Sequence, residues 1–332
     1  MGDGLTDDTA AFARAIASLG TAGGMVYVPG GTYLIDPLQS VRLTSNITLQ
    51  LASDAVLKAK PVSTTYYAIV LASDAQYVCI AGGTIIGERN AHLGTTGEWG
   101  MGVRIIGSSD VRIDGVQILD CWGDGIYVGA TAAHGESRRV TISKCIVRNN
   151  RRQGISITGC VGALVEDCEL TDTNGTEPQS GIDLEPNAPL RVCDVTIRNS
   201  IAVRNSGWGV LLCGGNVTDI RVESCQISDN AMDGSWVNHA SRCTLANNTV
   251  ERNRWCGVRL TGANNNQLLS NTFRDNCSAG PNYWSSILLA NASSGNLVDR
   301  NIFVHGWRRI PARADVSLAT PDCVNNTIVP ST

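Results

Sequence analysis

The chain has 332 residues, of which 43% are hydrophobic and 17% are charged, so it is long enough for one large domain or two ordinary ones. Its formal net charge of −4 argues against a nucleic-acid partner. No stretch approaches the roughly 18 consecutive apolar residues of a membrane span. Met1 is not followed by the basic and apolar runs of a signal peptide, so none is predicted.

The first predicted element is a helix over residues 6–20. Thr6 can serve as its N-cap, and Phe12, Ile16 and Leu19 fall on one apolar stripe at helical spacing. After this helix the sequence predicts two short strands that flank a Pro-Gly-Gly turn, at residues 25–28 and 32–35.

Beyond residue 35 the chain repeats. A glycine followed by a short alternating strand recurs at Gly125, Gly154, Gly181, Gly209, Gly234 and Gly257. In each repeat a second strand leads to a small or amide side chain, at Cys145, Cys168, Ser200, Cys225, Asn248, Asn271 and Asn301. A third segment ends in an amide, at Asn150, Asn174, Asn205, Asn230, Asn253 and Asn276.

Three short strands per repeat, with no helix between them, indicate a parallel β-helix. Its stacked coils would align equivalent residues at a spacing of about 4.8 Å, so the asparagines are predicted to form buried ladders. We therefore predict an all-β solenoid in one domain over residues 1–332, with coils over 36–330 and the helix 6–20 capping the first coil.

The twelve cysteines do not indicate disulfides. Cys145, Cys168 and Cys225 occupy the position that asparagine takes in other repeats, so we expect them to be buried free thiols. The absence of a Cys-x-x-Cys pair argues against zinc. No cofactor and no catalytic metal is predicted, although a structural calcium ion is left open.

Two stretches near the N-terminus are similar to a known family. Residues 2–9 (GDGLTDDT) and 23–33 (GGMVYVPGGTY) resemble the opening segment of the pectate-lyase-like right-handed β-helix superfamily. That superfamily includes polysaccharide lyases, glycoside hydrolases, phage tailspike depolymerases and mannuronan C5-epimerases. The resemblance implies a polysaccharide substrate, an extracellular or virion-associated location and, as in tailspikes, the option of a homotrimer. Members usually have a short strand before the position of Gly2, so we expect Met1 to begin a trimmed form of the chain.

The strand around residues 181–187 carries the predicted chemistry. Asp183 and Glu185 alternate with apolar residues at the strand period, which would hold two carboxylates side by side on an exposed face. Such a pair raises one pKa and costs stability unless it has a use. The alternatives are a solvated acidic strand or a structural cation site.

The same strand resembles the Y-G-F-D-P-H-E motif of the epimerases, which aligns Asp183 with a catalytic aspartate. Ser180 stands where that motif has tyrosine and Glu185 where it has histidine. The loop before Trp99 holds threonines and no lysine. A carboxylate pair without these groups suits glycosidic hydrolysis better than epimerisation.

Matching positions in successive repeats predict an outer column of six side chains: Tyr127, Ser156, Asp183, Leu211, Trp236 and Arg259. Tyr127 and Trp236 would each lie two coils, roughly 10 Å, from Asp183. They could stack sugar rings along a groove, or merely cover backbone.

Further substrate contacts are predicted from Asn238, His239 and two arginines. Arg152 and Arg259 could bind a uronate carboxylate or simply keep the face soluble. His239 could be an acid or base, or an ordinary structural histidine.

Three additional carboxylates could enlarge the site. Asp124 and Asp233 each precede a glycine and could equally be turn residues. Glu177 lies in the loop 173–179 before the acidic strand, where it would form a wall of the groove.

The sequence as a whole predicts an enzyme that hydrolyses an acidic polysaccharide with Asp183 and Glu185 as acid and base or nucleophile. One alternative is a lyase or C5-epimerase that keeps Asp183 and uses Tyr127, His239 or an arginine. Another is a non-catalytic glycan-binding fibre or adhesin, which would bind its glycan without changing it.

Overall fold

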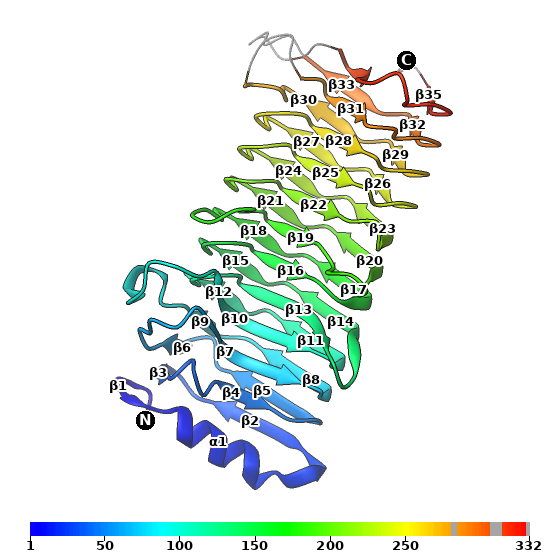
Figure 1. The fold of residues 1–332 in the computed structure, drawn as a ribbon. Coiled ribbons are helices and arrows are strands. Elements are labelled where there is room, and N and C mark those ends of the chain that lie inside the picture. Colours follow the sequence, from blue (N-terminus) through cyan, green and yellow to red (C-terminus); the bar gives the residue numbers. More distant parts are fainter. Residues whose placement is uncertain (280–283, 306–313, 330–332) are drawn as a thin grey trace.

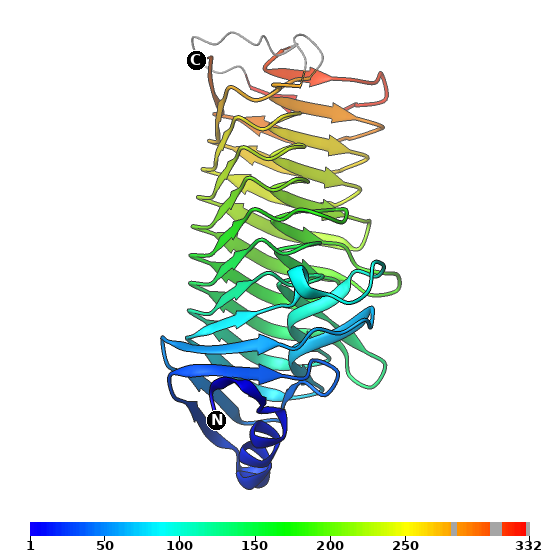
Figure 2. The same ribbon diagram turned by 90° about the vertical axis from the view of Figure 1, so that its left-hand side faces the viewer.

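Each repeat of the sequence forms one coil of three short strands, and successive coils stack with equivalent strands parallel (Figures 1 and 2). The computed structural model describes residues 1–279, 284–305 and 314–329. Within these residues the strands form three parallel ladders, and the antiparallel pairing of Ala130 with Glu136 joins two of them. The predicted all-β solenoid is confirmed, while the assignment of the whole chain to one domain stays a prediction.

The three ladders are named here in the order in which a coil visits them. Ladder 1 consists of β4 (Val41–Leu43), β7 (Tyr66–Ser73), β10 (Trp99–Ile106), β13 (Ile126–Thr131), β16 (Ile155–Ile157), β19 (Ile182–Leu184), β22 (Val210–Cys213), β25 (Ser235–Asn238), β28 (Val258–Thr261), β31 (Ile287–Ala290) and β34 (Val316–Leu318).

Ladder 2 consists of β2 (Gly24–Val28), β5 (Ile47–Leu51), β8 (Gln76–Ala81), β11 (Ser109–Asp114), β14 (Gly135–Ser143), β17 (Cys160–Glu166), β20 (Val192–Arg198), β23 (Val217–Glu223), β26 (Thr244–Ala246), β29 (Gln267–Leu269), β32 (Leu297–Asp299) and β35 (Thr327–Ile328). Ladder 3 consists of β1 (Asp3–Asp7), β3 (Gly31–Ile35), β6 (Ala55–Ala59), β9 (Thr84–Ile86), β12 (Gln117–Leu119), β15 (Ile146–Arg148), β18 (Glu169–Thr171), β21 (Ile201–Val203), β24 (Gln226–Ser228), β27 (Thr249–Glu251), β30 (Thr272–Arg274) and β33 (Ile302–Val304).

The helix at the N-terminal end is shorter than predicted. Helix α1 spans Thr9–Ser18, a 3₁₀ turn η1 follows at Gly20–Ala22, and residues 3–7 form strand β1. The expected N-cap Thr6 therefore lies in a strand, because its backbone N–H is bound by the Asp3 carboxylate instead. Figure 1 shows α1 at the N-terminal end of the stack, as predicted for a cap. In the described part of the chain, no helix has the length and apolarity to cross a membrane.

The recurring glycine is explained by the approach of neighbouring coils. A Cβ on Gly154 would lie 2.3 Å from the carbonyl oxygen of Gly181, and one on Gly181 would lie 2.8 Å from that of Gly209. Real Cβ atoms essentially never come this close to backbone, so a side chain would push the coils apart. Directly after these glycines, Ile155 and Ile182 are fully buried and contribute to the continuous apolar core.

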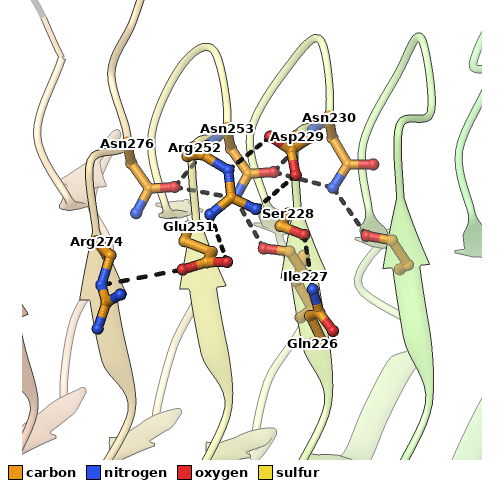
Figure 3. A network of polar contacts seen from close by, with 11 residues as sticks. Gln226, Ile227, Ser228, Asp229, Asn230, Glu251, Arg252, Asn253, Arg274 and Asn276 are labelled. Atoms are coloured by element: carbon orange, nitrogen blue, oxygen red, sulfur yellow. Dashed lines mark hydrogen bonds and ion pairs between the residues drawn. The ribbon is translucent and has the colours of Figure 1, made fainter.

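The predicted asparagine ladders are present. Asn253 accepts hydrogen bonds from the backbone and side chain of Asn230 and donates to Asn276 and to the carbonyl of Ile227 (Figure 3). One position was assigned wrongly: Thr173, not Asn174, stands in this ladder, where its N–H binds Asn205. The Asn174 side chain instead accepts a hydrogen bond from Arg89 at 2.6 Å.

The cysteine prediction is also confirmed. Cys145, Cys168 and Cys225 are buried and unpaired, and each thiol donates to backbone carbonyls.

A short 3₁₀ turn, η2 (Arg89–Ala91), lies in the long connection between β9 and β10.

The ladder in Figure 3 allows a paired test of what stabilises the stack. Asn253→Ala should lower the unfolding free energy by about 2–3 kcal/mol, because it leaves buried hydrogen-bonding groups without partners. Its neighbour Arg252 binds Asp229 in an exposed ion pair at 2.8 Å, so Arg252→Met should cost less than about 1 kcal/mol. Denaturant unfolding of both variants would measure the difference, and equal losses would contradict a stack held by its amide ladders.

Candidate active site

The strand register aligns the predicted outer column. Tyr127 pairs with Ser156, Ser156 with Asp183, and Asp183 with Leu211. The column continues through Trp236 to Arg259 in the next two coils. Tyr127 and Trp236 therefore lie two coils on either side of Asp183.

The expectation that Asp183 and Glu185 share an exposed face is wrong for Asp183. Its residue is 2% exposed, and the whole strand β19 is buried, whereas Glu185 is half-buried just beyond the strand. The strand period correctly turns Asp183 away from the core residues Ile182 and Leu184. The period does not reveal what covers the outer side, which here includes a glutamine from the previous coil.

That glutamine fixes the chemistry of the Asp183 carboxyl group. Gln153 donates from Nε2 to Asp183 Oδ2 at 2.7 Å, while its own Oε1 accepts the backbone N–H of Ser180 at 2.7 Å. Because the Ser180 bond sets the amide orientation, Oδ2 of Asp183 must be an acceptor. The other oxygen, Oδ1, is buried without a partner among the described residues. A proton on Asp183 therefore resides on Oδ1.

Burial determines the charge of this group. Loss of hydration raises the pKa of Asp183 well above its ordinary value, and the carboxylates of Glu185 and Asp124 raise it further, against the opposing charge of Arg152. Burial likewise raises the pKa of Asp124 to about 6, with Arg152 partly offsetting it. Asp183 therefore keeps its proton to higher pH than an ordinary aspartate does.

Arg152 links this cluster to the loop 87–98. Its Nε donates to Glu98 at 2.9 Å and its Nη1 lies 3.3 Å from Asp124 Oδ1. The loop is itself anchored by Glu88, whose carboxylate accepts from the Tyr67 hydroxyl and lies 2.8 Å from His92 Nδ1.

The two arginines expected to bind a uronate are already occupied. Arg152 pairs with Asp124 and Glu98, and Arg259 pairs with Asp233 at 2.6 Å. Asp124 and Asp233 are not exposed turn residues, since both side chains are fully buried. Burial raises the pKa of Asp233, and Arg259 opposes that shift.

An aromatic cluster surrounds the second of these pairs. Trp208 donates to Asp233 at 3.1 Å, and its ring lies 5.1 Å from that of Trp236. The Arg259 guanidinium lies 4.4 Å from the Trp236 ring centroid and 5.7 Å from that of Trp255. Trp236 is thus held from one side by an arginine and from the other by a second indole.

Three of the remaining predicted residues, Tyr127, Asn238 and His239, lie two coils from Asp183. Tyr127 accepts a hydrogen bond from Thr158 at 2.7 Å. Asn238 donates to Cys213, and the exposed His239 places Nδ1 2.8 Å from the oxygen of Asn238. Glu177 is exposed on its loop.

Gln153 and Glu98 were missed by the sequence reasoning. Gln153 directly precedes Gly154, as Asp124 precedes Gly125 and Asp233 precedes Gly234. Comparing the residue before each glycine would have placed it beside the acidic column. Glu98 lies in a loop outside the repeat, where periodicity gives no information.

A metal centre has no support in the side-chain geometry. Across the residues that the structure describes, no three His, Cys, Asp or Glu side chains converge as a metal site would require.

A hollow of about 940 Å³ lies beside α1, and its lining residues, which include Ile16 and Arg42, are far along the stack from Asp183.

Comparison with known proteins agrees with the coil geometry. The sequence model of the family described as "Right handed beta helix region" matches residues 44–188 and 133–303, which together span well over half of the chain. The chain belongs to the right-handed β-helix family.

Two curated relatives of this β-helix come from Bacillus subtilis strain 168. The uncharacterized protein YclG is 33% identical over 253 residues, which are 64% of this chain and 43% of YclG. The SPbeta prophage-derived uncharacterized protein YorA is 36% identical over 191 residues, or 48% of this chain and 32% of YorA. The β-helix thus spans less than half the length of either relative.

Solved structures match the β-helix over nearly its full length. The A-module of the Azotobacter vinelandii mannuronan C-5 epimerase AlgE6 superposes with a TM-score of 0.84 at 19% identity, covering 99% of this chain and 96% of that one. The Dettilon tailspike protein has a TM-score of 0.78 at 18% identity, and the match covers 98% of this chain and 63% of the tailspike. The periplasmic alginate epimerase AlgG has a TM-score of 0.64 at 18% identity, and the match covers 93% of this chain and 77% of AlgG. At these identities the likeness establishes the shared fold.

The burial of Asp183 predicts a characteristic dependence of stability on pH. Its pKa is higher in the folded than in the unfolded chain, so the folded state binds more protons above about pH 4 and is destabilised as the pH rises towards the raised folded value. Asp183→Asn removes this effect. The melting temperature of the variant relative to the parent should therefore increase as the pH rises from about 4 towards that raised value.

Asp219 provides a control of opposite sign. Its pKa is lowered by the Arg242 ion pair on the surface, so Asp219→Asn should become less stable relative to the parent as the pH rises. Parallel thermal scans across the pH range would measure both trends. A flat difference for Asp183→Asn would contradict a proton held on Asp183.

Proposed function

We propose that this β-helix is a polysaccharide-active enzyme that hydrolyses glycosidic bonds with Asp183 as general acid and Glu185 as base or nucleophile. One observation carries the proposal. Asp183 is buried, its Oδ2 is held by Gln153, and its Oδ1 has no partner among the described residues. This arrangement favours a carboxylic acid that carries its proton on Oδ1, the oxygen that no described residue engages.

The proposed reaction adds water across the bond between two sugars. Asp183 gives the proton on Oδ1 to the leaving glycosidic oxygen as its bond to the anomeric carbon breaks. In the direct route, Glu185 takes a proton from the water that attacks the same carbon. Arg152 and Glu185 are the more exposed side chains whose charges act on Asp183.

The geometry favours hydrolysis over elimination or epimerisation. Those reactions need a base and an acid around one sugar carbon, and the sequence named Tyr127, His239 or an arginine for these roles. Arg152, whose charge acts on Asp183, is engaged by Glu98 and Asp124. Tyr127 lies two coils from Asp183, roughly 10 Å, with its hydroxyl bonded to Thr158. His239 follows strand β25, two coils to the other side, and faces its own neighbour Asn238.

The similar structures lend general support to a polysaccharide substrate. Their names describe a mannuronan epimerase, an alginate epimerase and a tailspike protein, and mannuronan and alginate are polysaccharides. An extracellular or virion-associated location fits this proposal. Assembly as a homotrimer stays a prediction.

The direct test replaces the two proposed catalytic carboxylates. Asp183→Asn and Glu185→Gln should each lower kcat on a cleaved polysaccharide by roughly 100-fold or more, the scale of losing a positioned proton-transfer group. Both should stay folded, because the replacements keep the side-chain shape. Glu223→Gln is the control, since Glu223 lies on β23 of ladder 2, outside the outer column, and its kcat should stay at the parental value.

The product identifies the reaction class. Mass spectrometry of digests from a panel of polysaccharides should show fragments that have gained one water molecule each. Fragments with an unsaturated sugar would instead establish a lyase, and unchanged chain length with altered sugar stereochemistry an epimerase. Wild-type turnover in both variants would place the active site elsewhere on the solenoid.

Gln153 should tune the same acid without taking part in the reaction. Its N–H favours the ionised form of Asp183, so Gln153→Ala should raise the pKa of Asp183 further and move the alkaline limb of the kcat/KM profile to higher pH. kcat should fall as well, because the proton is no longer confined to Oδ1. Gln226→Ala, at an exposed residue of β24 in ladder 3, should leave the profile unchanged, and a shift of the Gln153→Ala profile to lower pH would refute this role.

A further inference from the structure

A seventh side chain extends the outer column one coil towards the N-terminus. Arg104 pairs with Tyr127 on the next coil and with Leu71 on the coil before. Gly102 stands two residues before it, as Gly125 stands before Tyr127 and Gly181 before Asp183. Arg104 thus occupies the position equivalent to Asp183, three coils or roughly 14 Å away.

Aromatic rings surround the Arg104 side chain. Its guanidinium lies 4.7 Å from the ring centroid of Tyr66 and 5.9 Å from that of Tyr127. Tyr66 in turn meets Trp99 edge to face at 6.3 Å, and these two residues are 48% and 41% exposed. Large exposed aromatics beside a half-buried arginine form a surface that can stack a sugar ring and bind a charged substituent.

Arg104 differs from the other arginines of this region in its charge balance. Arg152 and Arg259 each pair with a buried aspartate, so neither carries an uncompensated charge. Arg104 forms no ion pair with any residue that the structure describes, and its Nε is buried without a hydrogen-bond partner. A buried N–H of a cation is costly unless an acceptor satisfies it, and a planar carboxylate fits the guanidinium fork.

We infer that Arg104, with Tyr66, Trp99 and Tyr127, is a subsite for the carboxylate of a uronic acid residue in the substrate chain. The inference rests on the proposed function only for the class of ligand, a polysaccharide. It makes the substrate acidic at a position about three coils from Asp183. The positive charge comes from Arg104 rather than from the two arginines that the sequence suggested.

The experiment measures binding without turnover. In the full chain carrying Asp183→Asn, calorimetry would compare oligomers of mannuronate, guluronate and galacturonate with the same oligomers after reduction of their carboxyl groups. At least one acidic oligomer should bind more tightly than its reduced form. Adding Arg104→Met should weaken binding of that acidic oligomer by roughly 10- to 100-fold and leave the reduced form unaffected.

Two controls separate this effect from general charge or misfolding. Arg104→Met keeps an apolar stem against the tyrosines, and circular dichroism should match the parent. Arg221→Met removes an exposed arginine on ladder 2, 64% exposed at its side chain, and should leave both affinities unchanged. Raising the salt concentration should weaken binding of the acidic oligomer to the parent far more than binding to Arg104→Met.

Two results would overturn the inference. One is that no acidic oligomer binds more tightly than its reduced form, and the other is that Arg104→Met weakens both forms equally. Failure of the proposed catalysis is distinguishable, because it would appear as undiminished turnover in Asp183→Asn while the selective loss of acidic binding in Arg104→Met remained.

Discussion

The register between neighbouring coils is the constraint on which the rest of this structure depends. Strands that stack at about 4.8 Å place equivalent residues side by side, so each polar group inside the stack needs its partner one coil away. Asn253 meets this need with four hydrogen bonds to adjacent coils. The same register governs the outer column, where Gln153 reaches Asp183 because it stands one coil before it.

Two charges beside the outer column, those of Asp124 and Asp233, are balanced from the next coil, whereas two on the column, at Asp183 and Arg104, are not. Asp124 and Asp233 are buried opposite arginines, which supply both charge and hydrogen bonds. Asp183 receives a direct hydrogen bond only from a neutral amide among the described residues, and burial therefore raises its pKa well above the ordinary value. Arg104 is the converse case, because its guanidinium pairs with no carboxylate among the described residues. Asp183 and Arg104 are three coils apart on one column.

Much of the fold could be predicted because close coil contact leaves a periodic record. Gly181 marks where a coil's backbone approaches the next, and this spacing alone aligned the column through Asp183. Burial could not be predicted, since it depends on neighbouring coils and on loops outside the repeat. The ladder position went to Thr173 because the amide of Asn174 serves a cross-loop bond to Arg89, a contact between segments far apart in sequence. Glu98 likewise lies in a loop outside the repeat, so the periodic pattern of the sequence could not indicate its contact with Arg152.

A purely structural role explains Asp183 poorly. The coils on either side place Ser156 and Leu211 at the same column position, so the geometry of the stack accepts a small hydroxyl or an apolar side chain there. A carboxyl group at this position is desolvated, stands near Glu185 and Asp124, and leaves one oxygen without a hydrogen bond, and each of these features destabilises the fold. A leucine would avoid all three. A role in proton transfer accounts for them together, because a general acid needs a raised pKa, a fixed orientation and a free oxygen that bears the proton.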